Sequence, residues 1–127
     1  MSKHFIKFFY IIIFILGFLL SRNIISNDIP VGQLVDFTGP TSSVGKPFGQ
    51  GHIDAIKWIN KNGGINNRKI RVDTVDYSYK APRAVATYKR WKSRLKVITV
   101  IGWGTADTEA LMETIARDKI PFFSGSY

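Results

Sequence analysis

The chain contains no cysteine among its 127 residues. This absence excludes disulfide bonds, thiolate metal sites, cysteine nucleophiles and the lipid-acceptor cysteine of bacterial lipoproteins. Histidine is nearly as scarce, because only His4 and His52 occur. His4 lies near the N-terminus and His52 on the apolar side of an expected helix, where packing is a more common role than proton transfer. A pair of histidines for a metal is lacking, so we predict no metal, no cofactor and no enzymatic activity.

Nucleotide-binding and hydrolase motifs are also missing. There is no G-x-x-x-x-G-K-[ST] loop and no G-x-S-x-G elbow. Gly102 and Gly104 begin a dinucleotide-like pattern, but it follows the third expected strand and has Asp107 where the third glycine is needed. Three other aspartates, Asp36, Asp73 and Asp76, fall at expected strand ends. For these we favour capping or turn roles over a carboxylate site.

Acidic residues are half as frequent as basic ones, with 9 against 18 and a formal net charge of +9. Lys3, Lys7 and Arg22 precede Asn27, so the remainder keeps 15 basic and 9 acidic residues, or +6. The densest basic stretch is "KRWKSRLK", residues 89–96. Its tryptophan and leucine recur at helical spacing, which indicates a solvated helix face rather than a nucleic-acid patch. We therefore predict no nucleic-acid partner.

The longest apolar run is "FFYIIIFILGFLL", Phe8 to Leu20, and it follows two lysines. A run of this length is too short for a bilayer-spanning helix of about 20 residues and is typical of a secretory signal. We predict a signal peptide over residues 1–26 and a periplasmic or extracytoplasmic location for residues 27–127. No clean cleavage site follows the run, which leaves an uncleaved membrane anchor as the alternative.

After Ile29, short β-rich runs alternate with amphipathic stretches. Such alternation predicts parallel strands with helices on both faces, an α/β three-layer sandwich around a doubly wound sheet. The expected strands are 29–37, 69–77, 96–102 and 120–127. The expected helices open at Pro47, at Pro82 and near Thr105. Their expected inward faces are Phe48, His52, Ala55, Ile56 and Ile59; Val85, Tyr88, Trp91 and Leu95; and Ala110, Leu111, Ile115 and Ala116.

Three loops after expected strands are rich in hydroxyl groups and glycine: residues 37–46, 102–108 and 124–127. In a doubly wound sheet, ligands bind at the carboxyl ends of the strands. A helix N-terminus with neighbouring hydroxyl groups suits a small anion such as a carboxylate. Ordinary helix capping by Thr105 or Thr108 explains the same residue types and stays open as the alternative.

These segments together resemble the substrate-binding proteins of branched-chain amino-acid type ABC transporters, which have the type I periplasmic-binding fold. The resemblance is carried by "FTGPTSSVG", "DAIKWINKNGGINNRKIRVDTVDY", "YKAPRAVATYKR" and "VIGWGTADTEAL" leading to "ARDKIPFFSGSY". It implies two α/β lobes that close over a ligand. Residues 27–127 would then form only the N-terminal part of the first lobe, so we expect a truncated fragment of a leucine-binding-protein-like domain.

The resemblance also implies a set of ligand-binding residues that hold an α-carboxylate. Carried over by position, they are Ser43, Val44, Thr105, Ala106, Asp107, Thr108, Ser126 and Tyr127. Ala106 stands where amino-acid binders often have serine, and Trp103 is bulkier than usual. Asp107 would repel a carboxylate unless it turns away or caps the helix. The ligand therefore stays open among amino acids, amides and small acids.

The implied function is the extracytoplasmic solute-binding component of an ABC transporter, whose closed form docks on the membrane subunits. A ligand-sensing receptor domain of the same fold and a non-functional truncated fragment are the alternatives. Because the second lobe is missing, we expect the 127-residue chain alone to bind ligand weakly or not at all.

Overall fold

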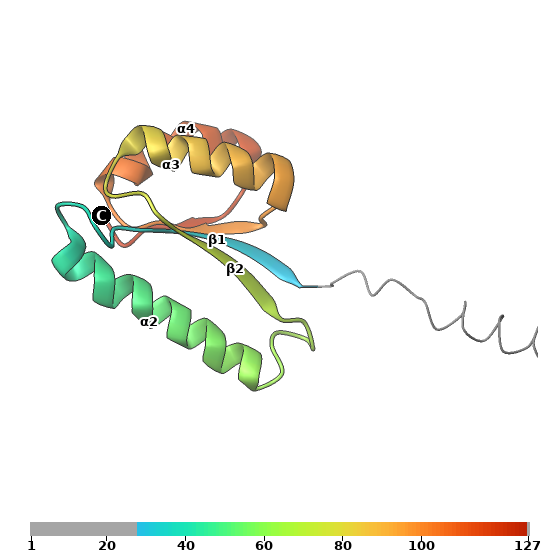
Figure 1. Ribbon diagram of the computed structural model, residues 1–127. Coiled ribbons are helices and arrows are strands. Elements are labelled where there is room, and N and C mark those ends of the chain that lie inside the picture. Colours follow the sequence, from blue (N-terminus) through green and yellow to red (C-terminus); the bar gives the residue numbers. More distant parts are fainter. Residues whose placement is uncertain (1–27, 127) are drawn as a thin grey trace, which may run out of the picture.

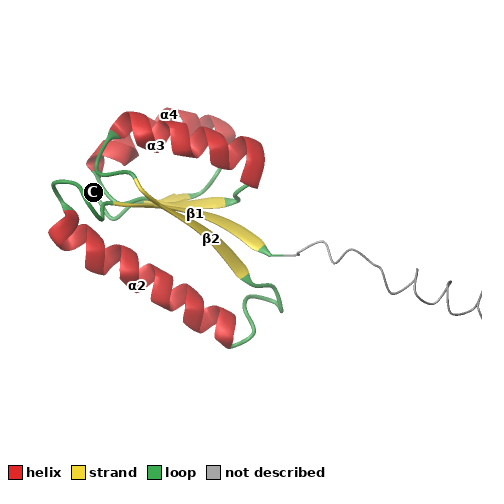
Figure 2. Ribbon diagram, viewed as in Figure 1, coloured by secondary structure: helices red, strands yellow, loops and turns green. Residues whose placement is uncertain are grey.

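The computed structural model describes residues 28–126, which fold into one parallel sheet with helices on both faces (Figures 1 and 2). The predicted signal peptide, residues 1–26, and the predicted site residue Tyr127 lie outside the described residues. Within the described part, no helix is both long and apolar enough to cross a membrane.

The sheet has the strand order β2-β1-β3-β4. Its strands are β1 (Ile29–Val35), β2 (Ile70–Asp76), β3 (Thr99–Ile101) and β4 (Phe122–Phe123), and every pairing is parallel. From β1 the chain first adds β2 on one side and later β3 on the other. The connections therefore diverge between β1 and β3, which creates a switch point at the carboxyl ends of these strands.

Helix α2 (Ser42–Lys61) covers one face of the sheet, and α3 (Ala81–Arg90) and α4 (Thr105–Asp118) lie together on the other (Figure 1). Helix α3 continues into a wider π-helical turn, η1 (Trp91–Leu95), which ends at Lys96 in the left-handed conformation. The predicted α/β architecture with a parallel, doubly wound sheet is confirmed.

The main core lies between the sheet and the α3–α4 layer. Trp91 is fully buried there, and its ring packs flat against β1, where an added Cβ on Gly32 would come within 2.5 Å of the ring. The indole Nε1 donates to Asp73 on β2 at 2.5 Å. Because this hydrogen bond satisfies the indole N–H group, the ring can be buried without leaving an unpaired donor. The other fully or nearly fully buried apolar residues of this cluster are Leu34, Tyr77, Ala84, Tyr88, Val97, Val100, Leu111 and Ile115.

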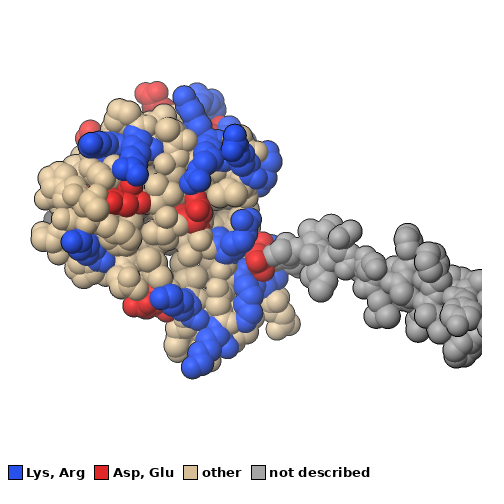
Figure 3. All heavy atoms as spheres, viewed as in Figure 1, with Lys and Arg blue, Asp and Glu red and all other residues tan. Residues whose placement is uncertain are grey.

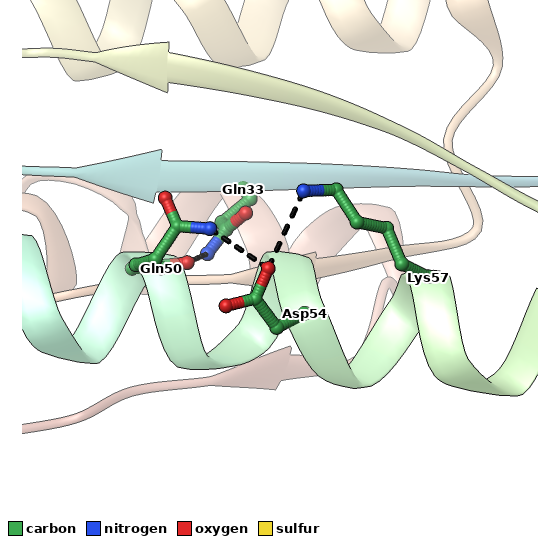
Figure 4. A network of polar contacts seen from close by, with 5 residues as sticks. Gln33, Gln50, Asp54 and Lys57 are labelled. Carbon is green, nitrogen blue, oxygen red and sulfur yellow. Dashed lines mark hydrogen bonds and ion pairs between the residues drawn. The ribbon is translucent and has the colours of Figure 1, made fainter.

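A buried amide joins β1 to the opposite layer. Gln33 is fully buried; its Nε2 donates to the carbonyl of Gly49 in α2 at 3.1 Å, and its Oε1 accepts from the hydroxyl of Thr74 on β2 at 2.8 Å. Farther along the outer face of α2, Gln50 and Lys57 both contact Asp54 (Figure 4). The Gln33 bonds satisfy a polar group that would otherwise destabilise the interior.

Several predicted boundaries and faces are wrong. Helix α2 begins at Ser42, five residues before Pro47, so Pro47 lies inside the helix and cannot donate to the carbonyl of Ser43. The first turn of the helix packs against the loop after β1 at Gly45. A Cβ at this position would lie 2.3 Å from the carbonyl oxygen of Asp36. The strands are shorter than predicted, and three alanines predicted to face inward are exposed: Ala55, Ala110 and Ala116.

Candidate functional site

A pocket of about 250 Å³ opens at the carboxyl ends of the strands, beside the switch point. Loops after all four strands contribute to its wall, and none of the contributing side chains carries a charge. The lining residues are Thr41, Tyr79, Trp103, Gly104, Thr105, Gly125 and Ser126.

The loop after β1 is organised by a buried carboxylate. Asp36 is fully buried and accepts the N–H of Gly39 at 2.5 Å and the N–H of Thr41 at 2.8 Å. It also accepts the Thr41 hydroxyl at 2.6 Å. The Thr41 oxygen in turn accepts the indole N–H of Trp103 at 2.8 Å. Asp36 therefore fixes the side of the pocket that Thr41 forms, in the turn role predicted for it.

The loop after β3 has the same construction. Asp107 is fully buried, and its Oδ1 accepts the phenol of Tyr77 at 2.6 Å and the N–H of Gly104 at 2.8 Å. Its Oδ2 accepts the N–H of Trp103 at 2.9 Å. Burial, followed by the hydrogen bond to Asp107 and its negative charge, raises the pKa of Tyr77 far above its usual value, so this phenol stays protonated and donates.

Asp107 thus turns away from the pocket and caps its own helix, which was one of the two outcomes considered from the sequence. Three donors surround the carboxylate, and its side chain has no exposed surface. Its negative charge is therefore hydrogen-bonded inside the loop and does not face the pocket. The predicted direct ligand contact by Asp107 does not fit this geometry.

Helix α4 begins at the pocket. Its N-cap is Gly104, which has no side chain to cap the helix, and its first residue is Thr105. The first N–H groups of a helix have no partner within the helix. The N–H groups of Thr105 and Ala106 therefore remain at the pocket end, where the positive end of the helix dipole favours an anion.

Hydroxyl groups link α4 to the loop after β4. Thr105 and Ser126 share a hydrogen bond of 2.9 Å at the pocket wall. Behind them, Thr108 donates to the carbonyl of Gly104 at 2.7 Å and lies 2.7 Å from the hydroxyl of Ser124. The N–H of Ser126 donates to Ser124 at 3.0 Å. Hydroxyl groups therefore hold the loop after β4 against α4.

The predicted site residues in the described part of the chain divide into four groups. Thr105 and Ser126 lie in the pocket wall, Ala106 and Thr108 lie half-buried next to it, and Asp107 supports it from behind. Ser43 and Val44 are exposed in the first turn of α2 and do not line this pocket. Ligand contact by the residues other than Asp107 remains a prediction.

Sequence reasoning missed Thr41 and Tyr79. Tyr79 has a left-handed backbone with φ of 58° and packs so closely over Gly104 that a Cβ there would lie 2.7 Å from its ring. The signal was available in part, since Tyr79 follows the end of β2 by three residues. The order β2-β1-β3-β4, which brings this loop to the pocket, is not readable from the sequence.

Asp76 secures the neighbouring loops at the end of β2. Its oxygens accept the N–H of Phe37 at 3.0 Å, the N–H of Ser78 at 3.0 Å and the hydroxyl of Thr38 at 2.6 Å. Burial by itself raises the pKa of Asp76, but these donors, with the charge of Arg83, outweigh it and hold the pKa below the ordinary value of 3.8. The capping role predicted for Asp76 fits these contacts.

The profile of the family described as "Periplasmic binding protein" matches residues 28–127, which is most of the chain. The chain belongs to this family. The predicted resemblance is thereby confirmed. The loops that form the pocket lie wholly within the matched region.

Individual similar proteins support the same family. An amino acid binding protein from Pseudomonas aeruginosa is 33% identical over 75 residues, which are 59% of this chain and 20% of that protein. The crystal structure of a substrate-binding protein of an ABC transporter from Aeropyrum pernix is 42% identical, with a TM-score of 0.73, over 77% of this chain and 27% of that one.

A third likeness concerns the fold alone. The branched-chain amino acid transporter substrate-binding protein LivJ from Streptococcus pneumoniae, solved with isoleucine, has a TM-score of 0.73 at 24% identity, over 79% of this chain and 29% of that one. The chain thus spans between a fifth and a third of the length of these three relatives.

Proposed function

We propose that this chain carries part of the ligand-binding cleft of the extracytoplasmic solute-binding component of an ABC transporter. The ligand class is an amino acid or a related small acid or amide, and its carboxylate or carbonyl group lies at the N-terminus of α4. Family membership and the relatives from Pseudomonas aeruginosa and Aeropyrum pernix support the class of protein. The observation that carries the ligand chemistry is the inward turn of Asp107.

An anion bound at the N-terminus of α4 would contact no negatively charged side chain. The seven lining residues are uncharged, and the two nearest loop carboxylates, Asp36 and Asp107, are fully buried and saturated with donors. Both carboxylates instead hold backbone donors in place. Preorganised loops lose little freedom when a ligand binds, so weak individual contacts contribute more to affinity.

Counting hydrogen atoms identifies the groups that can donate to a ligand. The Thr41 hydroxyl hydrogen points to Asp36 and that of Thr108 to the carbonyl of Gly104, so neither is available. Thr105 and Ser126 have two hydroxyl hydrogens but need only one for their mutual bond. The phenol of Tyr79, also in the lining, makes no hydrogen bond among the described residues. Two hydroxyl donors, with the N–H groups of Thr105 and Ala106, therefore remain for an acceptor in the pocket.

The same count assigns different roles to the predicted residues. Thr105 and Ser126 contact the ligand, and Ala106 contributes through its backbone only, which explains why a serine is not required there. Thr108 and Asp107 are positioning residues. The family is one of binding proteins, and we assign this pocket to binding without chemistry on the ligand.

Transport would follow from differential binding. A ligand held by this wall and by an opposing lobe favours the closed form, and the closed form is what the membrane subunits of the transporter would bind. The predicted signal peptide at residues 1–26 would deliver the chain across the cytoplasmic membrane.

Thermal unfolding of the full chain in zwitterionic detergent, with a panel of amino acids at high millimolar concentration, tests this proposal. A ligand at ten times its Kd stabilises the folded state by about 1.4 kcal/mol, which raises Tm by several degrees for a domain of this size. We expect at least one amino acid to raise Tm and the matching amine, which lacks the carboxylate, not to do so.

Two matched variants locate the effect. Thr105→Ala removes a pocket hydroxyl and should reduce the shift, whereas Thr99→Ala, at the opposite end of the strand that leads to this loop, should retain it. Equal shifts by an amino acid and its amine, or a shift that Thr105→Ala leaves unchanged, would count against the proposed function.

A further inference from the structure

The described domain has two chemically different ends. The pocket lies where the strands end, and basic residues gather where the strands begin (Figure 3). The C-termini of α2, η1 and α4 all reach this second end, because each is followed by a parallel strand. We call it the basic end and define it by five exposed residues: Lys61, Arg71, Arg94, Lys96 and Lys119.

These five cations are not neutralised by neighbours. Within residues 28–126 none of them forms an ion pair, whereas Lys92 and Arg117, close by, both contact Asp118. The acidic residues lie elsewhere: Asp36, Asp76 and Asp107 are at the pocket end. Near the basic end, Asp118 is already engaged by Lys92, and Asp73, two residues after Arg71 on β2, is engaged by Arg90.

Favourable interactions with helix C-termini do not explain why all five cations lie at the basic end. A cation at a helix C-terminus complements the dipole, which explains about one per helix, but Arg71 lies on the edge strand β2. Lys96 and Lys119 also have left-handed backbones, with φ of 52° and 55°, where glycine is the favoured residue. The sequence therefore has a charged side chain at two positions where backbone conformation favours glycine.

In the uncleaved form of the chain, the apolar run from Phe8 to Leu20 brings this end near a membrane. Its most apolar run ends at Leu20, and the eight residues from Ser21 to Asp28 separate that run from β1. Eight residues span at most about 29 Å. While the run from Phe8 to Leu20 is inserted in a bilayer, the strand starts and the basic end cannot lie farther than this from the headgroups, and the pocket lies at the opposite end.

We propose that the basic end is a docking surface for anionic lipid headgroups. It holds the domain against the membrane with the pocket directed away from the bilayer. Each cation near an anionic surface strengthens binding by a factor of about five, so several unpaired cations acting together suffice for a salt-sensitive association. The proposal concerns a surface remote from the pocket and does not depend on the identity of any ligand.

Lysine footprinting on the full chain tests it. The chain is reconstituted into vesicles of phosphatidylcholine, or of phosphatidylcholine with phosphatidylglycerol, and exposed to a membrane-impermeant amine-reactive ester. We expect Lys61, Lys96 and Lys119 to react several-fold more slowly on the anionic vesicles and to recover in 0.5 M salt. Lys46 and Lys80, exposed at the pocket end, serve as internal controls and should react equally on both.

A pair of double variants separates charge from folding. Lys96→Gly with Lys119→Gly removes two cations at positions whose backbone suits glycine, so the fold is retained and the protection of Lys61 should fall. Lys46→Gln with Lys80→Gln removes the same charge at the other end and should leave that protection intact. Equal labelling on both vesicle types, or an equal fall at both ends, overturns the proposal. Protection of the three lysines by a soluble DNA duplex but not by anionic vesicles overturns it in favour of a nucleic-acid surface.

Discussion

The phenol of Tyr77 donates to the buried carboxylate of Asp107 at 2.6 Å, although the two residues are 30 positions apart. The bond joins the residue just after β2 to the first turn of α4. Both side chains are fully buried. This contact holds the negative charge of Asp107 inside the loop and leaves the pocket wall uncharged.

Removing the carboxylate should be costly. Asp107→Ala leaves the Tyr77 phenol and the N–H groups of Trp103 and Gly104 buried without an acceptor, and we expect a loss of about 3–5 kcal/mol in the free energy of unfolding. Tyr77→Phe removes one donor only and should cost about 1.5–3 kcal/mol. Urea unfolding of both variants and of the double variant that combines Asp107→Ala with Tyr77→Phe gives the coupling energy. Additive effects would show that the two residues do not act as a pair.

Two glycines offer a matched test of the packing. Gly32→Ala places a Cβ within 2.5 Å of the Trp91 ring and should destabilise the fold by about 1–3 kcal/mol. Gly51→Ala, on the open face of α2 with no atom within 4 Å, should stabilise it by about 0.5–1 kcal/mol. Chemical denaturation measures both. Similar effects at the two positions would contradict the close contact between β1 and Trp91.

Asp76 gives the fold an acid-sensitive contact. Its folded pKa lies below the unfolded value of 3.8, so its contribution to stability is fully present above about pH 4 and is lost as pH falls through the folded pKa. Asp76→Asn should flatten the acid limb of a stability profile measured by urea unfolding between pH 5 and pH 2. Thr38→Val, which removes one donor, should move that limb to higher pH. An unchanged limb in both variants would contradict this account.

Tyr88 should act at the alkaline end. Burial, with the hydrogen bond to Asp118 at 2.9 Å, raises its pKa from 10.0 to about 12. The neutral phenol is the favoured form in the folded state, so its contribution is fully present below pH 10 and declines as pH rises toward 12. Tyr88→Phe should therefore show less loss of stability over this range than the parent chain. A steeper loss in the variant would reverse the assignment.

The sequence was sufficient for the architecture because it rests on strong signals. The alternation of β-branched runs and amphipathic stretches is dense, and Leu111, Ile115, Tyr88 and Trp91 are inward as their spacing predicts. Alanine carries little hydrophobic information, which is why Ala55, Ala110 and Ala116 were assigned to the wrong side. Pro47 was misplaced because its preference for a first turn is only statistical, and the close approach of Gly45 to Asp36 is a tertiary effect.

The candidate site was predictable only in part. Loops after β1, β3 and β4 were expected to converge, and Thr105 and Ser126 do line the pocket. The place of Tyr79 in the pocket wall depends on the position of β2 in the sheet. Whether Asp107 faces a ligand or caps its helix depends on its hydrogen bond to Tyr77, which is distant in the sequence. Both are long-range relationships that local patterns do not encode.

The most direct measurement follows the three indole N–H groups by NMR in the 15N-labelled full chain. Trp103 lines the pocket and donates to Thr41, whereas Trp58 is exposed on α2 and Trp91 is buried against β1. Titration with an amino acid at millimolar concentration should shift the Trp103 resonance and leave the other two unchanged, and the methyl ester of the same amino acid should have a much smaller effect. Equal shifts with acid and ester, or shifts of Trp58 or Trp91 as large as that of Trp103, would contradict a carboxylate site in this pocket.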